Sequence, residues 1–210
     1  MTPRRIPMTL CPRCRPVWRT ARDVATLGDL CARWLEGTLC CQPAYGAALP
    51  PYPETAPLVP QLAALNRAGL FTTCSQPGSI GFERSGLVVR EQRAAVEAFA
   101  TSGIAGAVTA AARNAGLAVV AYDPATLPAI RFRRRRQVTA TRVDGTEVTW
   151  FGQQISRDYI TGAEGWGDCH PAAVAALCAS WQVTVTDPVW GRSDLLWDTL
   201  TRAIAPAVTS

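Results

Sequence analysis

The sequence predicts an α+β fold, an irregular α/β arrangement in which a mixed β-sheet core is flanked by about five helices. Several segments repeat apolar residues at three- and four-residue steps, the pattern of amphipathic helices. Other segments are short, apolar and bounded by turn residues, as strands are. Helices and strands follow one another without regular βαβ alternation, and this irregular order favours the α+β class.

Length and composition indicate a single domain. The chain has 210 residues, of which 48% are hydrophobic, enough for one sizeable core. We expect residues 1–20, which are rich in proline and arginine and lack periodicity, to form a poorly ordered arm. The domain would then span residues 21–210. Its first helix is predicted from Asp23 to Leu35, ending near Gly37, and residues 40–53 are predicted to be a loop.

The stretch after this loop predicts a helix that reverses into a strand. Leu58, Leu62 and Leu65 fall on one helical face, and Gly69 suits the C′ position that ends a helix. The residues from Leu70 to Cys74 are predicted to form a strand, followed by a turn at 76–79.

This reversal predicts a cluster of polar side chains. A helix of about twelve residues is ~18 Å long, and five strand residues cover ~17 Å, so the strand returns Ser75 to the level of Glu54. We expect Glu54, Thr55, Thr72 and Ser75 to gather around a helix N-terminus, where free N–H groups suit a ligand carboxylate. The alternative is that Thr55 is only an N-cap and Glu54 only a first-turn charge.

The rest of the chain predicts further helices and strands. Asp144-Gly145 is a strong signal for the two-residue turn of a β-hairpin. The residues from Gly78 to Gly86 are expected to be flexible. The predicted elements are helices at 92–100, at 104–114 before Gly116, at 171–181 and from Ser193 to about residue 204, strands at 117–122 and 182–186, and a hairpin at 138–151.

The eight cysteines are expected to be reduced thiols, because nothing marks the chain as secreted. Cys11 and Cys14 have the spacing of half a zinc site. A closed structural zinc site needs four ligands, and Cys40 and Cys41 are adjacent in sequence while Cys169-His170 lies far along the chain. We therefore expect no metal.

Charge excludes some functions and leaves one alternative open. The net charge of +5 comes from arginine, and the absence of lysine excludes a Walker A lysine, a Schiff base and a lysine general base. The arginine-rich run from Arg131 to Arg136 would suit nucleic acid, but such runs are more often solvated, so we do not expect nucleic-acid binding. No signal peptide or membrane span is predicted, which favours a cytoplasmic protein.

Three groups of residues, in this order, resemble a known family. They are Glu54-Thr55, then Leu65-Asn66-Arg67-Ala68-Gly69-Leu70-Phe71-Thr72-Thr73-Cys74-Ser75-Gln76-Pro77, then Gln92-Arg93-Ala94 with Glu97 and Phe99. This order resembles the C-terminal regulatory domain of eukaryotic methylenetetrahydrofolate reductase, which binds S-adenosylmethionine. The resemblance runs more weakly from Asp29 to Leu200. The Trp-Leu-Glu-Gly and Asn-Arg-Ala-Gly stretches also resemble those of small uncharacterised actinobacterial proteins.

The resemblance implies a stand-alone S-adenosylmethionine-binding module that acts as a sensor, a regulator or a sequestering protein. It implies that the ligand-binding site is lined by Glu54, Thr55, Thr72, Ser75, Thr149 and Thr161. A reductase barrel needs about 250 residues and cannot fit beside this domain, so any protein partner would be a separate chain. We expect no catalytic residue. One alternative is an enzyme that consumes the ligand by lyase or hydrolase chemistry, with Glu54 or Asp187 as base; another is an interaction or nucleic-acid-binding protein using Arg131 to Arg136.

Overall fold

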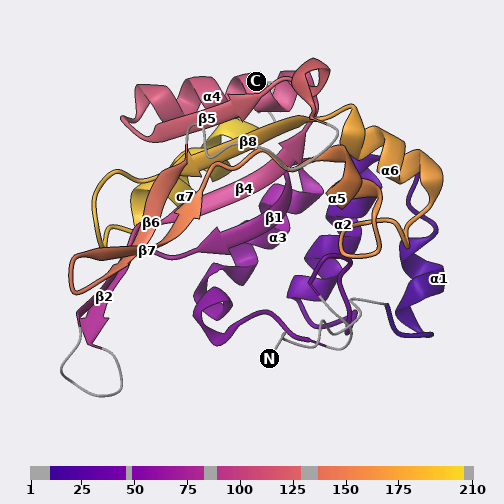
Figure 1. Cartoon of the computed structure of the whole chain (residues 1–210), viewed down its shortest axis with the longest axis horizontal. Helices are drawn as coiled ribbons and strands as arrows, with labels where there is room; N and C mark the ends of the chain where they lie inside the picture. Colours follow the sequence, from indigo (N-terminus) through magenta and orange to yellow (C-terminus); the bar gives the residue numbers. More distant parts are fainter. Residues whose placement is uncertain (1–9, 46–48, 83–88, 129–136, 206–210) are drawn as a thin grey trace.

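The computed structural model describes residues 10–45, 49–82, 89–128 and 137–205 (Figure 1). Within these ranges it has seven α-helices and two antiparallel sheets, so the predicted α+β class is confirmed. The helices are α1 Cys14–Trp18, α2 Val24–Leu35, α3 Val59–Arg67, α4 Ser102–Asn114, α5 Arg157–Thr161, α6 Pro171–Cys178 and α7 Asp194–Ile204, with short 3₁₀ helices η1 Pro53–Leu58 and η2 Pro124–Thr126. None of the helices in these ranges has both the length and the apolar character needed to cross a bilayer.

The first sheet has the strand order β1-β4-β8-β5. Its strands are β1 Phe71–Gln76, β4 Ala95–Ala100, β5 Ala118–Tyr122 and β8 Trp181–Thr186. Four helices pack beside one another along it in the order α2, α3, α7, α4, with α2 and α3 against β1 and α4 against β5 and β8. β1 is therefore an edge strand of this sheet, and one end of the helical layer lies on it.

The two faces of this sheet differ in their residues. Val96 is opposite Val185 in the antiparallel register, and both are buried in the main core with helix residues such as Leu196. Glu97 is opposite Thr184, and these two side chains line a cavity on the other face. Because successive strand residues point to opposite faces, one face of the sheet packs under the helices, and the other carries the buried Phe99 beside the polar Glu97.

The second sheet has the order β2-β3-β6-β7 and joins the first at a corner. Its strands are β2 Ser79–Phe82, β3 Val89–Gln92, β6 Val138–Val143 and β7 Thr146–Phe151. The side-chain amide of Gln76 donates to the carbonyls of Arg93 and Ala140, both at 2.9 Å. Ala95, Ala140 and Phe151 form a small buried cluster between the sheets. The corner places the end of β7 beside β1.

Several local predictions are confirmed. The helix predicted from Asp23 to Leu35 is α2, which begins at Val24, and Asp23 caps it by accepting a hydrogen bond from the Thr26 N–H at 2.7 Å. Gly69 has φ +91° at the end of α3, and Asp144 and Gly145 both have positive φ in the β6–β7 turn. Both turns need the left-handed region, which favours glycine, aspartate and asparagine.

The helix predicted for 92–100 is wrong, because these residues end β3 and form β4. Val96, Phe99 and Ala100 have the spacing of a helix. In the strand, however, Val96 and Ala98 face the helices, whereas Phe99 faces Trp166 on the opposite side of the sheet. A strand covered on both faces is apolar on both, so its sequence loses the alternation that identifies strands.

Smaller differences concern element ends. The helix predicted for 171–181 stops at Cys178, because Trp181 begins β8. Ser193 stands before α7, but its hydroxyl accepts from the Gly78 N–H at 3.3 Å and makes no side-chain cap. Of the stretch expected to be flexible, residues 79–82 form β2, and 83–88 lie outside the described residues.

The N-terminal segment also differs from expectation. Residues 14–18 form α1, and Trp18 is fully buried with its indole N–H donating to the Cys41 carbonyl at 2.9 Å. Residues 1–9 lie outside the described ranges, and so does the whole arginine run from Arg131 to Arg136, which falls within residues 129–136.

Candidate functional site

A cavity of about 310 Å³ lies at the free edge of β1. Its walls come from the last turns of α2, from η1, from β1 and from the end of β7. Five of the six predicted ligand-binding residues line it: Glu54, Thr55, Thr72, Ser75 and Thr149. The chain reversal from η1 through α3 into β1 thus returns Ser75 to the neighbourhood of Glu54, as the element lengths predict.

The entry to α3 differs from the predicted helix N-terminus. Glu54 and Thr55 lie within the 3₁₀ helix η1, and α3 begins only at Val59. Neither helix has a side-chain cap, so Thr55 is not an N-cap, whereas Glu54 does lie in the first turn of η1 as that alternative expects. Thr55 is instead buried against the cavity, while Glu54 is exposed.

The buried side chain of Asn66 fixes the far end of this unit. Its Nδ2 donates to the Thr72 hydroxyl at 2.6 Å and to the Leu62 carbonyl at 2.8 Å. Its Oδ1 accepts from the Thr72 N–H at 3.0 Å. Because the Thr72 hydroxyl accepts from Asn66, its own proton can be donated to a ligand acceptor.

A β-bulge at Thr73 directs the β1 side chains into the cavity. Thr72 pairs with Ala98 and Cys74 pairs with Glu97, so Thr73 is the extra residue. A bulge bends its strand and changes the direction of neighbouring side chains, which is why bulges are frequent beside active sites. Here Thr72, Thr73, Cys74 and Ser75 all reach the cavity wall.

A second cavity of about 390 Å³ adjoins the first. Five residues line both cavities: Gln42, Tyr45, Thr73, Cys74 and Trp150. The second cavity adds Glu97, whose carboxylate accepts from the Gly152 N–H at 2.7 Å, and the aromatic residues Tyr159 and Trp166. The two cavities together form one polar and aromatic hollow, which we call the β1 hollow.

The ionisable groups lining the β1 hollow are acidic. Glu54 and Glu97 line it, and no arginine or histidine lines it among the described residues. Burial raises the pKa of Tyr45 to about 12, and the negative charge of Glu54 adds to this. The pKa of the Cys74 thiol is also raised to about 12, by burial among protein atoms and then by the charges of Glu97 and Glu54. A cationic ligand would be favoured over an anionic one.

Aromatic rings form another part of the wall. Trp34 and Tyr45 meet edge to face with centroids 4.8 Å apart, and Tyr45 contacts Tyr52 at 5.6 Å. Such rings attract cations to their faces and stack with planar ligand groups. Sequence reasoning missed these three residues. The available signal was the position of Tyr45 and Tyr52 in the proline-rich loop directly before Glu54, because loops on a rigid scaffold often carry function.

Two residues singled out from the sequence lie elsewhere. Thr161 is on α5, where its hydroxyl donates to the Arg157 carbonyl at 3.1 Å, and it lines a different cavity. Asp187 is fully buried, and both of its oxygens accept from Arg192, at 2.7 and 2.8 Å. A carboxylate held in this way outside the β1 hollow is unsuited to act as a base on a ligand there.

Comparison with known proteins assigns the chain to a family. A family model described as a domain of unknown function (DUF6919) matches residues 13–207, so the chain belongs to that family. No curated protein matches the sequence.

Proposed function

We propose that this member of the DUF6919 family is a stand-alone S-adenosylmethionine-binding module without reductase activity, which acts as a sensor, a regulator or a sequestering protein. One observation carries the proposal. Five residues to which the resemblance to the reductase regulatory domain points line one cavity, although they are spread along the chain from η1 to β7. They are Glu54, Thr55, Thr72, Ser75 and Thr149.

The chemistry of the wall supports this ligand class. S-adenosylmethionine carries a sulfonium and an ammonium cation, a carboxylate and a planar adenine. The Glu54 carboxylate and the rings of Tyr45 and Tyr52 suit the cations. The hydroxyls of Thr72 and Ser75 are donors for the ligand carboxylate, and the remaining aromatic wall suits the adenine.

Size is compatible as well. Small-molecule sites commonly occupy about 300–1,000 Å³, and the β1 hollow combines cavities of about 310 and 390 Å³. The first cavity would receive the amino-acid end of the ligand beside Glu54. The second, with Trp166 and Tyr159, would receive the nucleoside.

The acidic wall predicts a preference between related ligands. S-adenosylhomocysteine lacks the methyl group and therefore the sulfonium charge, while the rest of the molecule is the same. We expect S-adenosylmethionine to bind at least tenfold more tightly, which corresponds to about 1.4 kcal/mol.

Isothermal titration calorimetry of the full chain with both ligands tests the proposal. The expected result is saturable binding of S-adenosylmethionine by wild type, weakened in Glu54→Gln and unchanged in Thr161→Ala, which lies outside the hollow. The proposal would be refuted if neither S-adenosylmethionine nor S-adenosylhomocysteine gave any heat of binding at high protein concentration. Chromatography of the ligand after long incubation addresses the enzymatic alternative, because a binding module returns the ligand unchanged.

A further inference from the structure

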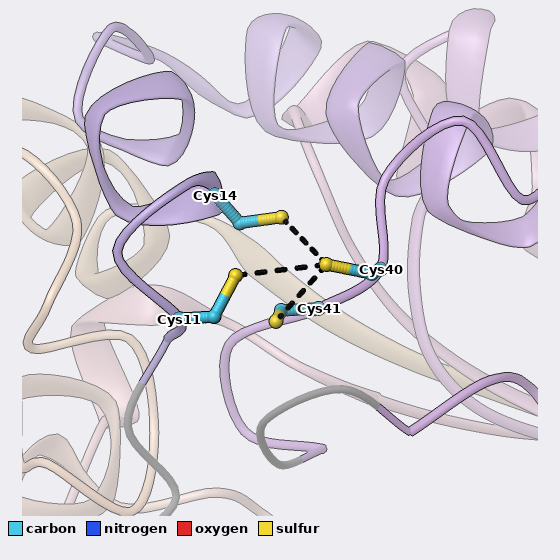
Figure 2. A group of neighbouring side chains, drawn as sticks. All are labelled: Cys11, Cys14, Cys40 and Cys41. Carbon is cyan, nitrogen blue, oxygen red and sulfur yellow. Dashed lines mark hydrogen bonds between the residues drawn. The ribbon is translucent and has the colours of Figure 1, made fainter.

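Four cysteines from two distant segments converge at one point beside α1 (Figure 2). The Sγ atom of Cys40 lies 3.4 Å from that of Cys14, 3.6 Å from that of Cys11 and 3.7 Å from that of Cys41. All four sulfur atoms lie within 4.8 Å of one another. Cys40 and Cys41, although adjacent in sequence, thus bring a second pair of thiols to Cys11 and Cys14.

The fold holds the two pairs in place by contacts of its own. The Cys14 and Arg15 N–H groups both donate to the Cys11 carbonyl, at 3.1 and 3.0 Å, which forms the turn that brings Cys11 and Cys14 together. The second pair lies in the loop after α2. The buried Trp18 indole donates to the Cys41 carbonyl at 2.9 Å and ties that loop to α1.

The sulfur spacing suits a metal ion better than a disulfide. Zn–S bonds of about 2.3 Å in a tetrahedron place neighbouring sulfurs about 3.8 Å apart. A disulfide requires about 2.05 Å and would use only two of the four sulfurs. Cys14 and Cys41 are buried, whereas Cys40 is exposed, so the cluster has a closed inner side and an open outer side through which an ion can enter.

We propose that Cys11, Cys14, Cys40 and Cys41 bind one Zn²⁺ ion in a structural site. Four thiolates arranged as a tetrahedron are the ligand set of structural zinc. On binding, the four thiols lose their protons and form four Zn–S bonds, which leaves a complex of charge −2. The ion would join the segment before α1 to the loop after α2 and so close the N-terminal part of the domain.

The cysteine cluster and the β1 hollow are connected by neighbouring residues of one loop. Gln42 follows Cys41 directly, lines both cavities of the hollow, and directs its amide toward the Cys31 sulfur at 3.9 Å. The metal would hold this part of the wall in place. Metal binding is measured independently of any ligand, so the zinc site and the proposed function can fail separately.

Metal analysis of the purified full chain tests the proposal. The protein is produced with zinc in the medium, kept reduced, and passed over a desalting column with a weak chelator before elemental analysis. We expect one zinc per chain in wild type and in Cys74→Ser, whose thiol lies in the wall of the β1 hollow and outside the cluster. Cys14→Ser and Cys40→Ser should each lose most of the zinc.

Cobalt substitution covers the case in which these variants fail to fold. Refolding the wild-type chain with Co²⁺ should give thiolate-to-cobalt charge-transfer absorption and the intense visible bands of tetrahedral Co²⁺, both abolished by added Zn²⁺. Three results would overturn the proposal: wild-type protein without zinc and without these bands, iron–sulfur absorption in place of zinc, or zinc that persists in a soluble Cys40→Ser variant.

Discussion

The side chain of Asn66 in α3 is joined to Thr72 in β1 by two hydrogen bonds, one in each direction, of 2.6 and 3.0 Å. Asn66 is fully buried, and its third hydrogen bond returns to α3 at the Leu62 carbonyl. The asparagine of the Asn-Arg-Ala-Gly stretch thus locks the angle between α3 and β1. This angle sets the distance between the two walls of the hollow to which Glu54 and Ser75 belong.

Replacing Asn66 by alanine should lower the free energy of unfolding by about 1–3 kcal/mol, because it leaves a buried Thr72 N–H without its acceptor. Urea denaturation measures the effect. Arg67→Ala is the matched control, since Arg67 makes an exposed ion pair with Glu36 at 2.6 Å, and such pairs contribute only ~0–1 kcal/mol. Equal losses in the two variants would contradict the role given to Asn66.

Glu54 and Ser75 should be coupled in ligand binding, because both line the same cavity although they are far apart in sequence. We expect Glu54→Gln to weaken S-adenosylmethionine binding by about 1.5–3 kcal/mol and Ser75→Ala by about 1 kcal/mol. The double variant should lose less than the sum, as expected for contacts to one ligand. Calorimetry measures all four proteins. Strict additivity would argue against a shared ligand, and an identical thermal shift in wild type and Glu54→Gln would exclude Glu54 from the site.

Gly28 lets α2 approach α3 closely, and its replacement by alanine should destabilise the fold. A Cβ atom at Gly28 would lie 2.2 Å from the Asn66 carbonyl oxygen, so the two helices would have to separate. Overpacking of this kind costs about 1–3 kcal/mol. Gly106→Ala in α4 is the control, because a Cβ there meets nothing within 4 Å, and it should stabilise by about 0.5–1 kcal/mol. Thermal unfolding of both variants should therefore move in opposite directions.

The Asp23 cap predicts a pH-dependent contribution to stability. Hydrogen bonding to Thr26 lowers the pKa of Asp23 in the folded state. The stabilisation is therefore present above the unfolded pKa of about 3.9 and is lost as the pH falls through the lower folded pKa. Asp23→Ala should unfold more easily than wild type by about 1 kcal/mol at neutral pH. The difference should shrink toward zero in strong acid, and a gap that did not change with pH would contradict this assignment.

Local signals in the sequence were sufficient for several parts of the fold. Gly69 and the Asp144-Gly145 pair identify turns because few residues accept positive φ, and the structure has positive φ at all three. The reversal from α3 into β1 followed from element lengths, and it placed Ser75 and Glu54 on one cavity.

Long-range packing explains what local signals missed. β4 is covered on both faces, so the spacing of Val96 and Phe99 imitates a helix. The four-cysteine cluster was missed because Cys40 and Cys41 reach Cys11 only through the way α1 lies against the loop after α2. The aromatic wall of Tyr45 and Tyr52 comes from a loop without periodicity, where a pattern of spacing gives no information.

The strand order β1-β4-β8-β5 has a consequence for how the chain is made. β8 lies between β4 and β5, yet it is the last strand of the described chain to be synthesised. Until Trp181–Thr186 leave the ribosome, β4 and β5 each expose an unpaired edge, and such edges pair readily with other chains. The sheet is therefore completed only after its other three strands have been made. A nascent chain stalled before Trp181 should bind chaperones or aggregate, whereas the finished chain closes its own gap.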